Sequence, residues 1–161
     1  MSRTRVLSLI VILLLPAANL LAQARVQKPN DFTLELGGRC LLYSLSYQRM
    51  LGKMAALEVG ASMIGGATEG TGTSVIFLSG GGRIYLMRNN ISPCIAGGAV
   101  YVTGVVDTGP FEATGSGVYF YLTPGFEYRM SGGFVFRGGV NFLIKGSSFF
   151  VWPGIALGIA F

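Results

Sequence analysis

Most of the chain after residue 31 alternates between apolar residues and polar or small ones. Successive side chains of a β-strand point to opposite faces, so this period of two predicts strands rather than helices. Segment 149–161 shows the pattern best, because Leu157, Ile159 and Phe161 share one face, while after Trp152 the other face carries only glycine and alanine. Segment 93–106 is ambiguous, since both of its faces are apolar or glycine. The predicted strands are 32–37, 41–48, 55–63, 75–87, 93–106, 118–129, 134–145 and 149–161.

The connections between these segments predict an up-and-down meander. Short turns follow the second, fourth and sixth strands, and tight turns are expected near 38–39 and 146–147. The connections at 65–73 and 107–117 are longer, rich in Gly, Ser and Thr, and are predicted to be loops that carry acidic residues on a solvated surface. Short turns at one end and longer loops at the other are typical of an outer-membrane barrel.

The two faces decide between a membrane barrel and a soluble one. Almost no ionisable residue falls on the large apolar face of the seven clear strands. An Arg or Lys on a lipid-facing wall would cost about 2–4 kcal/mol at the bilayer midplane, and a spanning sheet must close to satisfy its backbone. Aromatic residues gather toward both ends of this face, as two interfacial girdles would require. The sequence therefore predicts an all-β, closed antiparallel up-and-down transmembrane β-barrel of about eight strands.

The N-terminal segment has the features of a signal peptide. Arg3 and Arg5 precede an apolar run at 6–15, and Ala22-Gln23-Ala24 provides a small-residue cleavage site. The run is too short for a membrane-spanning helix. We expect a signal peptide at 1–24, cleaved after Ala22 or Ala24, and an exported barrel domain at 25–161 that resides in the outer membrane.

Composition narrows the chemistry. The 161 residues are 51% hydrophobic and 12% charged, with a formal net charge of +5 that falls when the signal is removed. That charge is too mild to predict nucleic-acid binding. The chain contains no histidine, so a histidine-serine acyl mechanism has no base, and no enzyme, cofactor or metal site is predicted. Cys40 and Cys94 are expected near opposite ends of the barrel, too far apart for a disulfide.

Polar residues on the opposite face are predicted to lie inside the barrel. The candidate lumen residues are Glu35, Glu58, Arg83, Glu127, Arg137 and Asn141. Buried charges must be paired, and an eight-stranded barrel leaves no wide aqueous channel. We interpret these residues as a structural network that fills the lumen. A polar pathway for a small solute is the alternative.

The chain resembles the small eight-stranded outer-membrane β-barrel proteins of Gram-negative bacteria. The most specific segments are "LELGG", "LYSLSYQRML", "LEVGAS" and the closing "GIALGIAF". Phe161, preceded by Ile159 and Leu157, is similar to the signal by which the assembly machinery recognises such barrels. The resemblance implies insertion from the periplasm with chaperone help. Its expected partners are outer-membrane lipids, the barrel-assembly machinery and periplasmic chaperones.

These observations predict an integral outer-membrane protein, a monomer, with a structural or surface-binding role, a polar filled lumen and short loops. A narrow, porin-like channel or conduit for a small or hydrophobic solute is the second hypothesis. A soluble periplasmic lipid-binding barrel is the third.

Overall fold

The computed structural model describes residues 24–68, 71–107 and 112–161. The predicted signal peptide therefore lies outside the described residues, except for Ala24. A short helix, α2 (Ala24–Gln27), precedes the first strand, and a 3-10 turn, η1 (Gly38–Cys40), joins the first two strands. The strands are β1 (Asn30–Gly37), β2 (Tyr43–Met50), β3 (Ala55–Thr68), β4 (Thr71–Tyr85), β5 (Ile91–Asp107), β6 (Glu112–Arg129), β7 (Phe134–Lys145) and β8 (Ser148–Ala160). No helix in the described part of the chain is long and apolar enough to cross a membrane.

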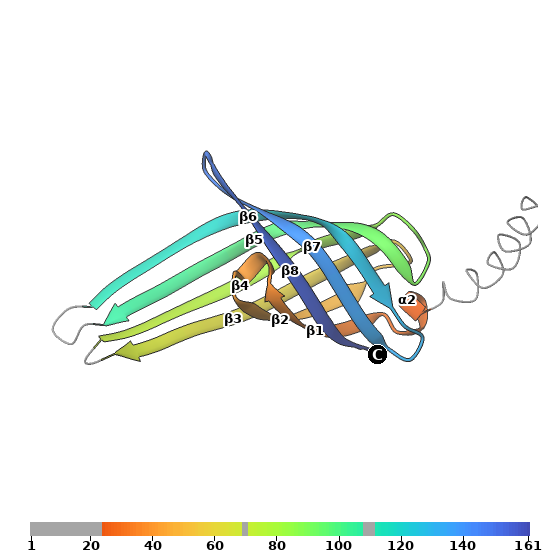
Figure 1. Ribbon diagram of the computed structural model, residues 1–161, viewed down its shortest axis with the longest axis horizontal. Helices are drawn as coiled ribbons and strands as arrows, with labels where there is room; N and C mark the ends of the chain where they lie inside the picture. The colour runs from red at the N-terminus through yellow and green to blue at the C-terminus, as the bar shows by residue number, and fades with distance from the viewer. Residues whose placement is uncertain (1–23, 69–70, 108–111) are drawn as a thin grey trace, which may run out of the picture.

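The strands form a closed barrel in which each pairs antiparallel with its sequence neighbours, and β8 pairs with β1. Leu34 faces Leu157 across this closing pair, and the backbones of Asn30 and Phe161 exchange two hydrogen bonds of 2.9 and 3.1 Å. The start of β1 and the C-terminal residue therefore lie at one end of the barrel, which we call the terminal end (Figure 1). The opposite end we call the far end. The predicted fold class and up-and-down topology are confirmed.

The wall separates apolar from polar side chains as the alternation predicts. Outward residues such as Leu45 and Ile159 are 65% and 64% exposed, whereas inward Ser44 and Glu127 are fully buried. Phe32 stacks on Phe161 and contacts Tyr47 at the terminal end, with ring centroids 5.7 and 5.2 Å apart. A solvent-facing wall would not concentrate large apolar side chains in this way.

The strands differ greatly in length. β1 and β2 have 8 residues each, whereas β5 has 17 and β6 has 18. The β2–β3 pairing stops at Leu45 opposite Ala61, and the hairpins of β3–β4 and β5–β6 continue far beyond η1 (Figure 1). The ambiguous segment 93–106 belongs to β5, whose register is set along its whole length by β4 and β6.

The prediction of long far-end loops is wrong for most of the residues concerned. Gly65 pairs with Ser74, Thr68 with Thr71, and Asp107 with Glu112, so both connections are largely hairpin strands. Alternation does not reveal these strand ends, because the part of a strand that extends beyond the apolar wall need not place apolar residues on one face. Threonine, which occurs in these segments, itself favours strands. Glu69 lies outside the described residues.

Candidate functional site

The half of the lumen near the terminal end holds a cluster of buried ion pairs. Arg137 donates from Nη2 to Asp31 Oδ1 at 2.7 Å and from Nε to Glu127 Oε2 at 2.8 Å. Arg129 binds both Asp31 and Glu127, and its Nε lies 3.2 Å from Glu127 Oε1. Strands β1, β6 and β7 supply these side chains from the inward face, so the cluster connects β1 to two strands with which it has no backbone pairing.

Arg25 of α2 extends this cluster toward the terminal opening. Its Nε lies 3.1 Å from Glu127 Oε1, its Nη1 donates to the Met87 carbonyl at 3.1 Å, and its guanidinium lies 4.2 Å from the ring centroid of Tyr85. The Tyr85 hydroxyl donates to Glu127 Oε2 at 2.5 Å. Arg25 is 3% exposed, so the residues before β1 close this end of the lumen.

A second cluster is centred on Arg39, which η1 carries into the barrel. Gly37 and Gly38 have φ values of 70° and 74°, a conformation that side chains other than glycine rarely adopt. This turn folds inward, and Arg39 reaches Glu58 as well as Ser46 Oγ at 2.9 Å. Arg83 Nη2 lies 2.9 Å from the other oxygen of Glu58.

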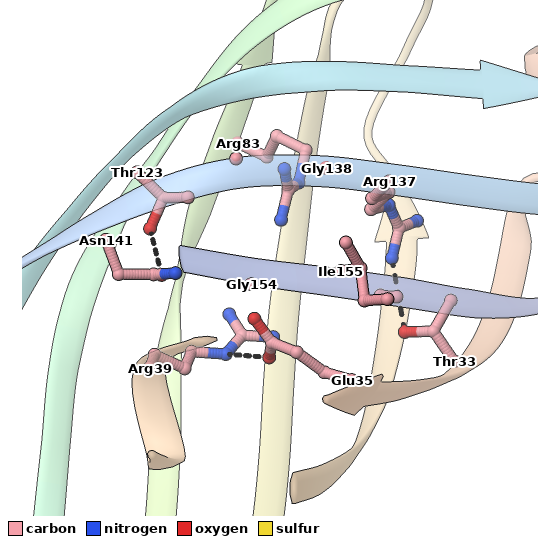
Figure 2. Close-up of a pocket in the computed structure, with 12 residues that line it drawn as sticks. Thr33, Glu35, Arg39, Arg83, Thr123, Arg137, Gly138, Asn141, Gly154 and Ile155 are labelled. Atoms are coloured by element: carbon pink, nitrogen blue, oxygen red, sulfur yellow. Dashed lines mark hydrogen bonds and ion pairs between the residues drawn. The ribbon is translucent and has the colours of Figure 1, made fainter. Parts of the chain in front are cut away.

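Glu35 and two tyrosines also bind residues of this second cluster. Arg39 Nε lies 3.3 Å from Glu35 Oε2, which also accepts a hydrogen bond from Ser44 Oγ at 3.1 Å. The Tyr121 hydroxyl donates to Glu58 Oε1 at 2.9 Å, and the Tyr119 hydroxyl donates to the Arg39 carbonyl. These bonds fix η1 across the lumen, and Figure 2 shows the pair of Arg39 and Glu35 among them.

Gln48 connects the two clusters. Its Nε2 donates to the Tyr85 hydroxyl at 2.8 Å, and its Oε1 accepts from Arg83 Nε at 3.2 Å. We call the connected set the lumen network. Among the described residues its charged members are Arg25, Asp31, Glu35, Arg39, Glu58, Arg83, Glu127, Arg129 and Arg137.

The network leaves almost no free space. The cavity among Glu35, Arg39, Arg83 and Arg137 has a volume of about 20 Å³, room for about one water molecule (Figure 2). Each carboxylate of the network contacts at least one arginine, so none is a free base for catalysis. Among the residues that the structure describes, no group of three or more acidic or cysteine side chains could hold a metal ion.

Five of the six predicted lumen residues belong to the network. Asn141 lies in the same interior, but it accepts a hydrogen bond from Thr123 Oγ1 at 2.6 Å and donates to the Trp152 carbonyl at 3.2 Å rather than joining an ion pair. Cys40 and Cys94 are both buried and free, and they belong to different apolar clusters, one on η1 and one near the start of β5.

Sequence reasoning missed four charged members of the network. Arg129 was on the predicted inner face, two residues from Glu127, and parity alone could have placed it in the lumen. Asp31 directly precedes the predicted first strand, and Arg39 was assigned to an ordinary turn. Arg25 lies before the first strand, where no periodicity applies. No local pattern signals a turn that folds into the barrel.

The predicted assembly signal lies on the outer wall. Leu157 and Ile159 of β8 are 47% and 64% exposed, and Phe161, which directly follows β8, is 52% exposed. Their common outward face agrees with the alternation, and recognition by the assembly machinery stays a prediction.

The fold and the ion-paired lumen define a small eight-stranded barrel with an apolar wall. No protein-family model matches the chain, and no curated protein matches its sequence. Solved structures share its fold. The N-terminal β-barrel domain of OprF from Pseudomonas aeruginosa is similar with a TM-score of 0.63 and 11% identity, over 82% of this chain and 95% of that one.

Two further barrels are similar at comparable identity. Neisserial surface protein A (NspA) has a TM-score of 0.52 and 10% identity, covering 82% of this chain and 93% of its own. Ail, the attachment invasion locus protein of Yersinia pestis, solved with the heparin analogue sucrose octasulfate, has a TM-score of 0.51 and 11% identity, covering 81% and 92%. At these identities the likeness establishes the eight-stranded barrel fold.

Proposed function

We propose that the chain is an integral outer-membrane β-barrel with a structural or surface-binding role and a lumen that does not conduct. The observation that carries this proposal is the inverted distribution of polarity: ion pairs fill the lumen between the terminal end and η1, while large apolar side chains cover the wall. A bilayer is the solvent that such a wall requires. The eight-stranded outer-membrane barrels of the same fold support the location.

Six of the eight strands are long enough to span a bilayer. β3 to β8 have 12 to 18 residues, which covers the roughly 9–11 residues that a tilted spanning strand needs, and β1 and β2, with 8 each, fall just short of it. The predicted signal peptide accounts for export. The terminal end would then face the periplasm and the long hairpins would face outward.

The lumen network argues against a conduit. A permeating solute would have to displace Arg39 on η1, then the paired arginines beneath it, and finally Arg25. Breaking a buried ion pair costs about 3–5 kcal/mol, and several would have to break together. We therefore assign function to the barrel surface. Ail, a barrel of this fold, was solved with a bound heparin analogue.

Two measurements test this proposal. Fractionation of cells should place the mature protein in the outer membrane, resistant to extraction with urea. Reconstitution into planar bilayers should give no steady single-channel steps. Recovery as a soluble periplasmic protein would overturn the membrane location, and steady steps from the unmodified protein would overturn the sealed lumen.

A further inference from the structure

Between η1 and the far end of the barrel, the inward side chains of the lumen are apolar rather than charged. Phe77, Val100 and Leu143 are buried in one cluster, and Val102 and Tyr119 pack against it. This part of the interior corrects the expectation of a polar lumen throughout. Part of this cluster lines a hollow, and a mostly apolar hollow with a few polar groups is the usual setting of a small-ligand site. We call this hollow the apolar cup. Its inner part is lined by Leu41, Phe77, Val102, Tyr119, Leu143 and Lys145, and its outer part by the exposed side chains of Val118, Ile144, Phe149 and Phe150.

The apolar cup consists of two cavities of about 480 and 260 Å³, which share Leu41, Tyr119 and Lys145 in their linings. Pockets for small ligands measure about 300–1,000 Å³. The larger cavity alone falls within that range. By contrast, the cavity inside the lumen network is about 20 Å³. The far end of the barrel therefore has room for a small molecule, whereas the cavity inside the lumen network does not.

The apolar cup is closed where it meets η1 and open between β6 and β7. Tyr119 donates to the Arg39 carbonyl, and Trp152 Nε1 donates to the Leu41 carbonyl at 2.8 Å, so η1 and its following residue seal the bottom. The β6–β7 pairing ends at Phe120 opposite Ile144, although β6 begins at Glu112. The β7–β8 hairpin diverges from β6 in this region (Figure 1). A chain molecule can therefore enter laterally between β6 and β7.

Lys145 places a positive charge at this opening. It is the last residue of β7, it is exposed, and its Nζ lies 3.5 Å from the position that a Cβ on Gly117 of β6 would occupy. No ion pair joins it to another residue in the described part of the chain. A cation at the rim of an apolar hollow is complementary to an anion that carries a hydrocarbon tail.

We propose that the apolar cup binds a single-chain anionic amphiphile of the fatty-acid class. The carboxylate lies on Lys145, and the hydrocarbon chain occupies the hollow between β6, β7 and η1. The sealed floor makes the cup a binding site and not a passage. This inference goes beyond the proposed function and depends on it only for the source of the ligand, since the binding geometry belongs to the barrel itself.

Trp152 provides a direct probe of occupancy. It is the one tryptophan of the chain, and its ring stacks on Phe150 with centroids 5.5 Å apart. A fatty acid brominated on its chain should quench the fluorescence of the full mature protein, purified in a non-ionic detergent, in a saturable manner. The methyl ester of the same acid should bind about two- to fivefold more weakly, because it lacks the charge. A brominated two-chain phospholipid should not saturate the site.

Two variants locate the ligand. Lys145→Gln should weaken binding of the acid about two- to fivefold and leave the ester unchanged, whereas Lys53→Gln, in the turn after β2, should change neither. Gly117→Phe should abolish saturable quenching by filling the cup. Gly80→Phe, on the outer wall of β4, adds the same bulk where a Cβ would meet nothing within 4 Å, and should have no effect. A shift on boiling in SDS verifies that each variant is folded.

Several results would overturn the inference. Equal quenching by acid and ester in both the unmodified protein and Lys145→Gln would remove the carboxylate site. Saturable quenching that survives in folded Gly117→Phe would place the ligand elsewhere, and the absence of saturable quenching would exclude the site. None of these outcomes depends on where the protein resides in the cell, so they are separable from a failure of the proposed location.

Discussion

At the residue scale, Glu127 pairs with more arginines than any other carboxylate of the lumen network. It contacts Arg25, Arg129 and Arg137 and accepts the hydroxyl of Tyr85, with its side chain fully buried. Removing a carboxylate from such a site leaves the arginines without a counter-charge. Breaking a buried pair by deleting one partner is far more costly than the pair is stabilising in itself.

We therefore expect Glu127→Gln to destabilise the folded barrel by about 3–5 kcal/mol. Glu35→Gln is the matched control, because Glu35 contacts Arg39 alone among the arginines described and its side chain is 14% exposed. That change should cost about 1–3 kcal/mol. Urea unfolding of the refolded proteins, followed by mobility in SDS, measures the difference. Equal losses from the two variants would show that pairing in the lumen does not govern stability.

Parity along the strands predicted much of the network but not its extent. Glu58, Arg83, Glu127 and Arg137 lie in clear strands, where one face is polar and the other apolar, so their inward position followed from alternation. Arg39 enters the lumen only because two residues before it adopt positive φ, a tertiary arrangement that no strand period describes. Arg25 approaches from outside the sheet altogether.

At the scale of elements, the β1–β2 connection controls the interior. Gly37 has φ of 70°, and a Cβ there would lie 2.5 Å from the Pro153 carbonyl oxygen of β8. The chain needs a glycine both for the backbone conformation and for the close approach of the two strands. Without that turn, η1 could not carry Arg39 into the barrel.

Gly37→Ala should therefore destabilise the barrel by at least about 1 kcal/mol more than Gly146→Ala. Gly146 has φ of 60° in the β7–β8 turn, but a Cβ there meets nothing within 4 Å, so only the conformational cost of about 1–2 kcal/mol applies. Unfolding in urea compares the two variants. A smaller loss for Gly37→Ala would show that the inward turn is not held by packing against β8.

The last strand carries a second element-scale prediction. Phe161→Ala should greatly reduce the amount of barrel in the outer membrane, while refolding in detergent changes little, because the lost ring contact is worth about 0.5–1.5 kcal/mol. Phe134→Ala removes an outward ring at the same end, opposite Ile159, and should not impair assembly. A parallel loss of assembly in both variants would argue that aromatic area, and not the terminal residue, is what matters.

Strand extents were the weakest sequence prediction. Alternation identified every strand where one face meets the apolar exterior, and boundaries at the terminal end agree within a few residues. The far ends of β3 to β6 contain Gly, Ser and Thr, which are common in loops. Their hairpins continue because each strand finds a neighbour in register, and pairing between distant residues leaves no local signature.

At the scale of the whole molecule, the interior has three levels. Arg25 and the residues before β1 close the terminal end, the lumen network fills the middle, and the apolar cup lies above η1. A closed sheet with an apolar outer wall has no edge and needs no water on that wall. The lumen network therefore supplies stability, and ligands and partners can reach the far end, where the apolar cup opens, and the wall.

The central claim is that the chain forms a closed barrel in the outer membrane, and one gel tests it most directly. The outer-membrane fraction is run in SDS with and without boiling. We predict a band in that fraction that migrates differently before boiling, because a closed, ion-paired barrel resists unfolding by cold SDS. A protein found in the soluble fraction, with the same mobility before and after boiling, would contradict the account and favour a soluble lipid-binding barrel.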